Sequence, residues 1–200
     1  MHRIITIGRE FGSGGRELGR RLAETLKIAY YDHEIIAEIA RRTSLSEQYI
    51  QSVSERAPVF SFPIHTGRSF YPAPNPAFDQ SLSVYREQSN ILREMAEKSD
   101  CVIVGRCADY VLKDYHPFRI FVCANMESKM QRCRENAPED EKLTDRELRQ
   151  MIQSVDKRRA GYYSFYTGQN WGDRLNVDIC INTSRMVIKE VVPAFARLFD

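Results

Sequence analysis

The feature that most constrains the fold is a glycine-rich loop that stands between an apolar run and an amphipathic helix. Residues 4–7, with the sequence IITI, predict a buried strand. Residues 8–16, GREFGSGGR, contain four of the ten glycines of the chain. Residues 16–27 then predict a helix, because three leucines spaced four residues apart share one of its faces.

Strand, glycine loop and helix in this order predict a phosphate-binding loop. Glycine has no Cβ, so the backbone can close around phosphate oxygens. The N-terminus of the following helix offers unpaired N–H groups and the positive end of the helix dipole. In an open α/β sheet this position lies outside the carboxyl ends of the strands, where ligands bind. A tight turn that binds nothing is the alternative interpretation.

The loop departs from the standard nucleotide-binding patterns. In the Walker A pattern G-x-x-x-x-G-K-[ST], with Gly14 as the second glycine, Arg9 stands first and Gly15 stands at the lysine. Arg16 then stands at the hydroxyl position. The dinucleotide pattern G-x-G-x-x-G fails as well, because Glu17 stands at its third glycine. The spacing alone therefore indicates a phosphate site without naming its ligand.

Further apolar segments alternate with helical ones along the chain. Strands are expected at 28–31, 101–104, 118–123 and 178–181. Helices are expected over 79–98, within the charged stretch 127–159, and after Asp32, Ser44 and Ser184. This alternation predicts one α/β domain over residues 1–200, with a doubly wound parallel sheet covered by helices on both faces.

The composition excludes several classes of protein. The 29 basic and 27 acidic residues leave a net charge of +2, which gives no sign of a polyanionic partner. No apolar run approaches the roughly 18 residues of a membrane-spanning helix, and the N-terminal run is too short for a signal peptide. The five cysteines, three of them (Cys101, Cys123 and Cys180) in apolar runs, are expected to be buried, reduced thiols. Neither they nor the four histidines have the spacing of a zinc site. A cytoplasmic location is expected.

Residues 58–76 interrupt the pattern with five of the eight prolines and several aromatic residues. Proline at this density excludes a regular helix or a central strand, whereas the aromatic residues argue against a free linker. A long ordered loop is expected here, as a lid, a contact surface or a surface loop without function.

Two other clusters stand where a ligand could bind. Gly105 and Arg106 end a predicted strand, where a guanidinium can be presented to a phosphate. Asp156 and Arg159 share a helix face, and Arg158 adjoins them. Arginines on a mobile lid can surround the oxygens of a phosphoryl group during its transfer. A surface arginine and a solvated charged helix are the alternative interpretations.

Five strings of residues occur together, in one order, over nearly the whole chain. They are ITIGREFGSGGR at 5–16, YYD at 30–32, VIVGRCADY at 102–110, DKRRAGYY at 156–163 and INTS at 181–184. These strings resemble the cytidylate kinase-like family of the P-loop nucleoside monophosphate kinase group. The resemblance implies a P-loop NTPase-type three-layer fold with an acceptor-binding region near 32–98 and a helical lid near 127–163. It also implies phosphoryl transfer from ATP, with Mg²⁺, to a pyrimidine nucleoside monophosphate, CMP or dCMP.

The same resemblance implies roles for single residues. The residues expected to hold the ATP phosphates are Gly12, Ser13, Gly14, Gly15 and Arg16. The residues expected to bind the acceptor are Asp32, Arg106, Asp109, Asp156 and Arg159. The expected catalytic cations are Arg16, Arg158 and Arg159. No metal ligand is assigned.

Departures from the family pattern keep other functions open. Gly15 and Arg16 stand where the genuine cytidylate kinases have a lysine and a metal-binding hydroxyl, and Arg9 or Arg16 could replace the lysine charge. Cys107 replaces the acid of a Gly-Arg-Asp string, unless Asp109 takes its place. A nucleotide-binding sensor without catalysis is the second hypothesis, and a nucleic-acid or protein-binding module is the weakest. A small-molecule nucleotide is the expected partner. No membrane or nucleic acid is expected, and self-association stays open.

Overall fold

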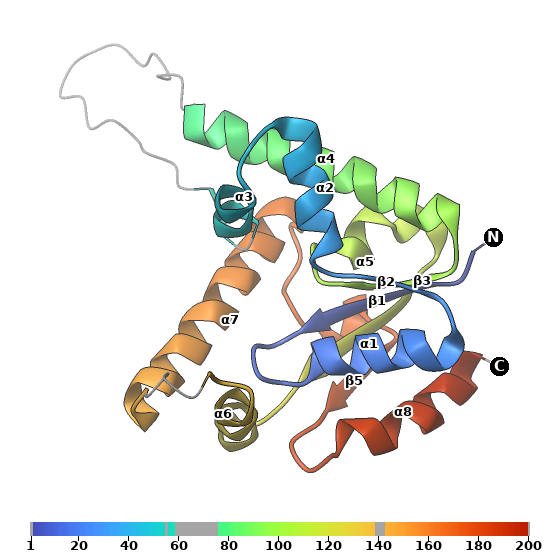
Figure 1. The fold of residues 1–200 in the computed structure, drawn as a ribbon, viewed down its shortest axis with the longest axis vertical. Coiled ribbons are helices and arrows are strands. Elements are labelled where there is room, and N and C mark those ends of the chain that lie inside the picture. Colours follow the sequence, from blue (N-terminus) through green and yellow to red (C-terminus); the bar gives the residue numbers. More distant parts are fainter. Residues whose placement is uncertain (1, 55, 59–75, 139–142, 200) are drawn as a thin grey trace.

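A parallel β-sheet forms the centre of the molecule (Figure 1). The computed structural model describes residues 2–54, 56–58, 76–138 and 143–199. The strands in these ranges are β1 (Ile4–Arg9), β2 (Ala29–Tyr31), β3 (Cys101–Val104), β4 (Phe118–Cys123) and β5 (Ile179–Asn182). They pair in parallel in the order β2-β3-β1-β4-β5. The predicted parallel sheet is confirmed.

Helices form most of the connections between the strands. The described α-helices are α1 (Gly15–Leu26), α2 (Glu34–Thr43), α3 (Glu47–Val53), α4 (Pro76–Lys98), α5 (Ala108–Val111), α6 (Met126–Glu135), α7 (Asp145–Thr167) and α8 (Ile188–Ala196). Short 3₁₀ helices occur at η1 (Lys113–Tyr115), η2 (Arg174–Asn176) and η3 (Arg197–Phe199).

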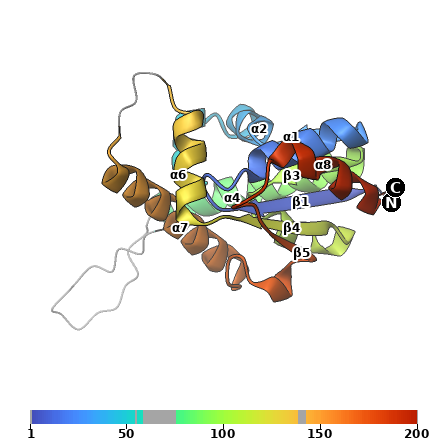
Figure 2. The ribbon, with the colours of Figure 1, turned by 90° about the horizontal axis from the view of Figure 1, so that it is seen from below.

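Alternate residues of the strands face two different helical layers. Ile5 and Ile7 of β1 pack in an apolar cluster with α1 and α8, whereas Ile4 packs on the opposite face with α2, α3, α4 and α5. Figure 1 shows α4 and α1 on opposite sides of the strands, and Figure 2 shows α8 beside α1. Successive side chains of a strand point to opposite faces, so an apolar strand needs a cover on both sides. The predicted three-layer α/β fold is confirmed.

The strands end together on the side of the molecule where α6 and α7 lie (Figure 1). β1 lies between β3 and β4, and the chain builds one side of the sheet through β2 and β3 before it crosses to β4 and β5. Open α/β sheets bind ligands outside the carboxyl ends of the strands at such a crossing point. The glycine loop, which directly follows β1, lies there.

The charged stretch 127–159 forms two helices rather than one continuous helical region. α6 and α7 are separate, and α7 continues to Thr167. Asp32 does not cap α2, whose N-cap is His33. The prediction of an Asp32 cap is wrong because its carboxylate pairs with arginine side chains instead.

Two serines expected to begin helices do not do so. α3 begins after Ser46, whose hydroxyl accepts an N–H of the first turn, and not after Ser44. The last helix begins at Ile188 rather than after Ser184. The Ser184 hydroxyl accepts the N–H of Asn125, so this side chain joins two loops instead of capping a helix.

The remaining expectations concern the proline-rich segment, the cysteines and the membrane. Segment 58–76 lies outside the described residues except for its first and last prolines. All five cysteines are free thiols; Cys101 and Cys107 are buried, but Cys180 is exposed on the edge strand β5, so the expectation of burial is wrong for it. None of the helices in the described ranges is long and apolar enough to cross a membrane.

Candidate functional site

The glycine loop joins the carboxyl end of β1 to the N-terminus of α1. Gly12 and Gly14 have φ angles of +72° and +82°, a left-handed conformation that favours glycine. A Cβ on Gly12 would also lie 2.8 Å from the carbonyl oxygen of Lys129. The Ser13 hydroxyl donates to the carbonyl oxygen of Glu10 at 2.8 Å. These glycines are therefore required by the shape of the loop and by its close contact with α6.

An open cavity of about 880 Å³ borders the loop, and we name it the loop cavity. Its walls come from the loop, α1, the connection from β2 to α2, α6 and α7. The predicted site residues that line it are Gly12, Gly14, Gly15, Arg16, Asp32 and Arg159. Cavities that bind small molecules have volumes of roughly 300–1,000 Å³. The loop cavity has the size of a small-molecule site, and several charged side chains line it.

Two side chains from other elements hold the carbonyl oxygens of the loop. Arg132 on α6 donates through Nη1 to the carbonyl oxygens of Gly12 (3.5 Å) and Ser13 (3.4 Å), and through Nη2 to that of Thr183 (2.6 Å). The Thr183 hydroxyl, just after β5, donates to the Ser13 carbonyl oxygen at 2.7 Å. The sequence prediction missed Arg132, because nothing distinguishes it among the charges of its stretch.

Arg16 and Asp32, predicted to bind different substrates, form an ion pair. Nε of Arg16 lies 2.6 Å from Oδ2 of Asp32, which is buried just after β2. Nη2 of Arg9 lies 3.9 Å from Oδ1 of the same carboxylate. The Arg16 side chain is 57% exposed, so its guanidinium lies at the rim of the loop cavity. Asp32 thus joins two arginines to the end of β2.

A buried lysine on α6 links the helix α7 to the glycine loop. Nζ of Lys129 lies 2.7 Å from Oε2 of Glu10 and 2.9 Å from Oδ2 of Asp156. Oδ1 of Asp156 accepts the N–H of Phe11 at 2.7 Å. Burial favours loss of the proton, but the hydrogen bonds to the two carboxylates prevail and raise the pKa of Lys129. Asp156, predicted as an acceptor ligand, is engaged with the loop and α6. Sequence reasoning missed Lys129.

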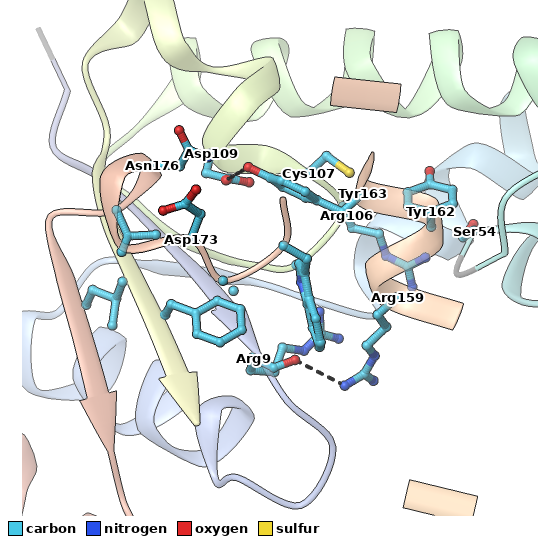
Figure 3. A pocket seen from close by; sticks show the side chains of 17 residues that line it. Arg9, Ser54, Arg106, Cys107, Asp109, Arg159, Tyr162, Tyr163, Asp173 and Asn176 are labelled. Atoms are coloured by element: carbon cyan, nitrogen blue, oxygen red, sulfur yellow. Dashed lines mark hydrogen bonds between the residues drawn. The ribbon is translucent and has the colours of Figure 1, made fainter. Parts of the chain in front are cut away.

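A second, smaller cavity lies beside the first, and we name it the inner cavity (Figure 3). Its volume is about 50 Å³, and it lies between the ends of β1 and β3, the side of β4, α7 and the segment before β5. Figure 3 shows Arg106 and Arg159 at one end of it and the carboxyl groups of Asp109 and Asp173 at the other. Arg9 and Arg159 line both cavities.

Arg106 is a buried cation of the inner cavity. Its exposed fraction is only 8%, and its Nε and Nη1 have no hydrogen-bond partner among the described residues. Its backbone is strained, since Gly105, Arg106 and Cys107 have φ angles of +75°, +62° and +54° in succession. The Arg106 carbonyl oxygen accepts from Gln88 Nε2 at 3.0 Å. Backbone strain and unpaired buried donors gather at functional sites, so Arg106 marks this cavity as one.

Asp109 lies at the opposite end of the inner cavity from the arginines. Its Oδ2 accepts the hydroxyl of Tyr163 on α7 at 2.6 Å. Burial raises the pKa of Asp109, and the hydrogen bond from Tyr163 opposes this rise. Cys107, which stands at the position of the family's acid, is buried, and burial raises the pKa of its thiol. A buried neutral thiol cannot do the work of a carboxylate, which leaves Asp109 as the acid nearest to that position.

The two adjacent arginines of α7 have different surroundings. Nη1 of Arg159 donates to the carbonyl oxygen of Arg9 at 3.4 Å, and its guanidinium lies 5.7 Å from the centre of the Phe11 ring. Arg158 instead donates to Ser154 Oγ on its own helix and lines neither cavity. The structure brings Arg159 to the site and leaves Arg158 apart from it.

The residues around the loop do not form a resident magnesium site. In the described ranges, no group of three metal-binding side chains comes together. Arg16 occupies the position of the Walker hydroxyl, and the nearby carboxylates of Asp32, Glu10 and Asp156 are paired with basic side chains. Where Mg²⁺ is bound to nucleotide phosphates, it takes most of its ligands from water and phosphate, so an ion of that kind needs no cluster of protein side chains.

Comparison with known families decides the affiliation of the chain. The cytidylate kinase-like family matches residues 4–185. The chain belongs to this family. Membership supports nucleotide kinase activity and the use of ATP, and it agrees with the glycine loop at the crossing point of the sheet. A comparison with curated proteins gives no match.

Solved structures agree on the fold of this cytidylate kinase-like chain. An uncharacterized protein from Eubacterium ventriosum has a TM-score of 0.67 and 26% identity, with 100% of this chain and 99% of that chain covered. Shikimate kinase from Bacteroides thetaiotaomicron has a TM-score of 0.58 and 17% identity, with 98% of each chain covered. Shikimate kinase from Acinetobacter baumannii, in complex with shikimate, has a TM-score of 0.55 and 16% identity, with 100% and 93% covered. The P-loop fold predicted from the sequence is confirmed.

Proposed function

We propose that the protein transfers the terminal phosphoryl group of Mg·ATP to a nucleoside monophosphate, most simply CMP or dCMP. The observation that carries this proposal is the pairing of two cavities across Arg9 and Arg159, with the unpaired Arg106 guanidinium in the inner one. A nucleoside monophosphate kinase must hold two phosphate-bearing substrates end to end, and membership of the cytidylate kinase-like family supports a nucleotide substrate.

On the donor side, the loop cavity receives the ATP phosphates. Backbone N–H groups of the loop and of the first turn of α1 take the phosphate oxygens, at the positive end of the helix dipole. Arg132 and Thr183 keep the loop in place by holding its carbonyl oxygens. Mg²⁺ enters as part of the substrate, bound to the phosphates.

On the acceptor side, Arg106 takes the phosphate of the monophosphate. Its unpaired Nε and Nη1 donate to phosphate oxygens in charge-assisted hydrogen bonds. The inner cavity has room for a phosphoryl-sized group, and α7 moves outward to admit the rest of the nucleotide. At the far end, Asp109 accepts from the exocyclic amine of the cytosine ring, which uridylate lacks. Arg159 lies between the two phosphates.

A nucleotide-binding sensor is the second candidate. The observation in its favour is the absence of a side chain at the Walker lysine position, where Gly15 stands, together with the pairing of Arg16 to Asp32. A phosphate loop without its lysine still binds phosphate through backbone N–H groups. Such a protein would bind ATP without forming product.

The test is a turnover screen of the purified protein with Mg·ATP and each ribo- and deoxyribonucleoside monophosphate, read as new diphosphate by mass spectrometry. We expect CDP or dCDP as the main product, and a loss of at least about 100-fold in Arg106→Met. Arg93→Met, on the exposed side of α4, is the matched control and should keep full turnover. A diphosphate formed from another monophosphate would show that the acceptor is not CMP or dCMP. ATP binding without any product would support the sensor.

A further inference from the structure

The glycine loop differs from the Walker A pattern at three positions, and two of them lie against each other in the structure. In this register the pattern begins with a glycine, where the chain has Arg9, and it has its lysine where the chain has Gly15. A Cβ on Gly15 would lie 2.5 Å from Cβ and 3.2 Å from Cγ of Arg9. The stem of Arg9 therefore fills the space that a side chain at position 15 would need. The basic residue and the glycine have exchanged places.

The Arg9 side chain then continues across the ends of the neighbouring strands. Its guanidinium lies against Gly105, where a Cβ would come within 1.7 Å of Nη1 and 2.8 Å of Cζ. Arg9 is 8% exposed, yet it lines both the loop cavity and the inner cavity (Figure 3). It thus lies at the boundary where a phosphoryl group would pass from donor to acceptor.

Three other cations at the loop are placed less well to contact a phosphoryl group between the two cavities. Arg16 is exposed and held by Asp32 at 2.6 Å. Lys129 lies between two carboxylates, and Arg132 donates to the carbonyl oxygens of the loop. Each of these groups shapes the loop or its rim. Arg9 and Arg159 both line the two cavities, but Arg159 comes from α7, whereas the stem of Arg9 fills the space at the Walker lysine position.

We propose that Arg9 is the catalytic cation that replaces the Walker lysine, with its guanidinium on the phosphoryl group in transfer. This inference rests on the proposed kinase function. An oxygen of the acceptor phosphate forms a bond to the γ-phosphorus, and the bond from that phosphorus to the bridging oxygen breaks. ADP leaves with the electron pair. The acceptor oxygen carries no proton to be removed, and Arg9 stays protonated throughout, as guanidinium groups do. Its contribution is electrostatic, toward the charge on the transferred oxygens.

The first experiment compares Arg9→Gln with Arg93→Gln, at an exposed arginine of α4 that lines neither cavity, in the full chain, after circular dichroism shows that both are folded. We expect Arg9→Gln to lower kcat by about 100- to 1,000-fold, as loss of one preorganised charge does elsewhere. Arg93→Gln should leave kcat and KM for ATP unchanged. Calorimetry adds a readout that needs no turnover: Arg9→Gln should reduce the preference for ATP over ADP at least tenfold.

The second experiment displaces the guanidinium without replacing Arg9. Gly105→Ala puts a methyl group into the space of Nη1, whereas Gly168→Ala is a matched control, because φ is +70° there and its Cβ meets nothing within 4 Å. Both variants carry the same backbone strain. We expect Gly105→Ala to lower kcat as much as Arg9→Gln does, and Gly168→Ala to keep the kcat of the wild type. The double variant Arg9→Gln/Gly105→Ala should have no lower kcat than either single variant.

The outcomes separate this inference from the proposed function. If the wild type makes a diphosphate and Arg9→Gln keeps kcat within threefold, the role of Arg9 is overturned and the kinase stands. If the wild type binds ATP but phosphorylates nothing, the proposed kinase function is overturned. If Arg9→Gln then also keeps the preference for ATP over ADP, the proposed contact of Arg9 with the phosphoryl group is overturned as well. If the wild type binds no ATP, both proposals fail together.

Discussion

Around the glycine loop, the charged side chains are matched by opposite charges or carbonyl oxygens, whereas the inner cavity buries a cation with unpaired N–H groups. Lys129 lies between Glu10 and Asp156, and Arg16 lies on Asp32. Arg106, in contrast, leaves Nε and Nη1 without a partner in the described structure. Paired charges stabilise a shape, while unpaired buried donors cost stability and are retained for a ligand. The side chains around the loop cavity are thus held in place in advance, and the unpaired donors of the inner cavity support the proposal that it binds an anion.

The largest effect is expected from removing the paired cation. Lys129→Met leaves Glu10 and Asp156 close together without their shared lysine, and breaking a buried ion pair in this way costs about 3–5 kcal/mol. Arg106→Met removes a cation whose donors are already unpaired, so we expect its free energy of unfolding to stay within about 1 kcal/mol of the wild type, or to rise. Urea denaturation of both variants measures the difference.

Lys189→Met, an exposed lysine on α8, is the control for loss of a surface charge and should have no measurable effect. Equal destabilisation by Lys129→Met and Arg106→Met would contradict the comparison. It would mean that Arg106 is as well paired in the inner cavity as Lys129 is beside the glycine loop.

The fold and the position of the loop followed from local patterns. Apolar runs ended by glycines predicted the strands and their carboxyl ends, because a strand buried on both faces leaves a continuous apolar signal. Four glycines before an amphipathic helix predicted the phosphate loop. Arg106 was predicted for the same reason, since it follows the end of a buried strand.

The contacts that Lys129 and Arg132 make with the loop could not be predicted from such patterns. Lys129 and Arg132 belong to a stretch, 127–159, with nine basic and eight acidic residues, where the sequence does not tell a buried charge from a solvated one. Arg158 and Arg159 are neighbours in sequence but about 100° apart around a helix, and only the packing of α7 decides which one faces the cavities. Charge pairing depends on tertiary contacts that periodicity does not encode.

A second, smaller effect tests how tightly the loop is fixed against α6. Gly12→Ala introduces a side chain at φ +72° and places its Cβ 2.8 Å from the Lys129 carbonyl oxygen, whereas Gly168→Ala has the same strain in open space. We expect Gly12→Ala to lose about 1–3 kcal/mol more than Gly168→Ala, the usual cost of forcing atoms into a packed site. Thermal denaturation in parallel gives this difference. Equal losses would show that the loop moves freely from α6, and the description of a loop cavity built in advance would fail.

The smallest effect concerns the proton of Asp109 in the inner cavity. Burial raises the pKa of this carboxyl group in the folded state above its unfolded value of about 4. The folded protein therefore holds the proton more tightly, and the stability it provides is complete below pH 4 and is lost as the pH rises through the folded pKa. Asp109→Asn removes that loss, so the stability of the variant relative to the wild type should increase with pH above 4 and then level off. Unfolding measured from pH 4 to 8, with the exposed Asp114→Asn as control, provides the comparison. A difference that stays constant over this range would show that the inner cavity does not favour the protonated acid, and the contrast with the charged pairs of the loop cavity would be confined to Arg106.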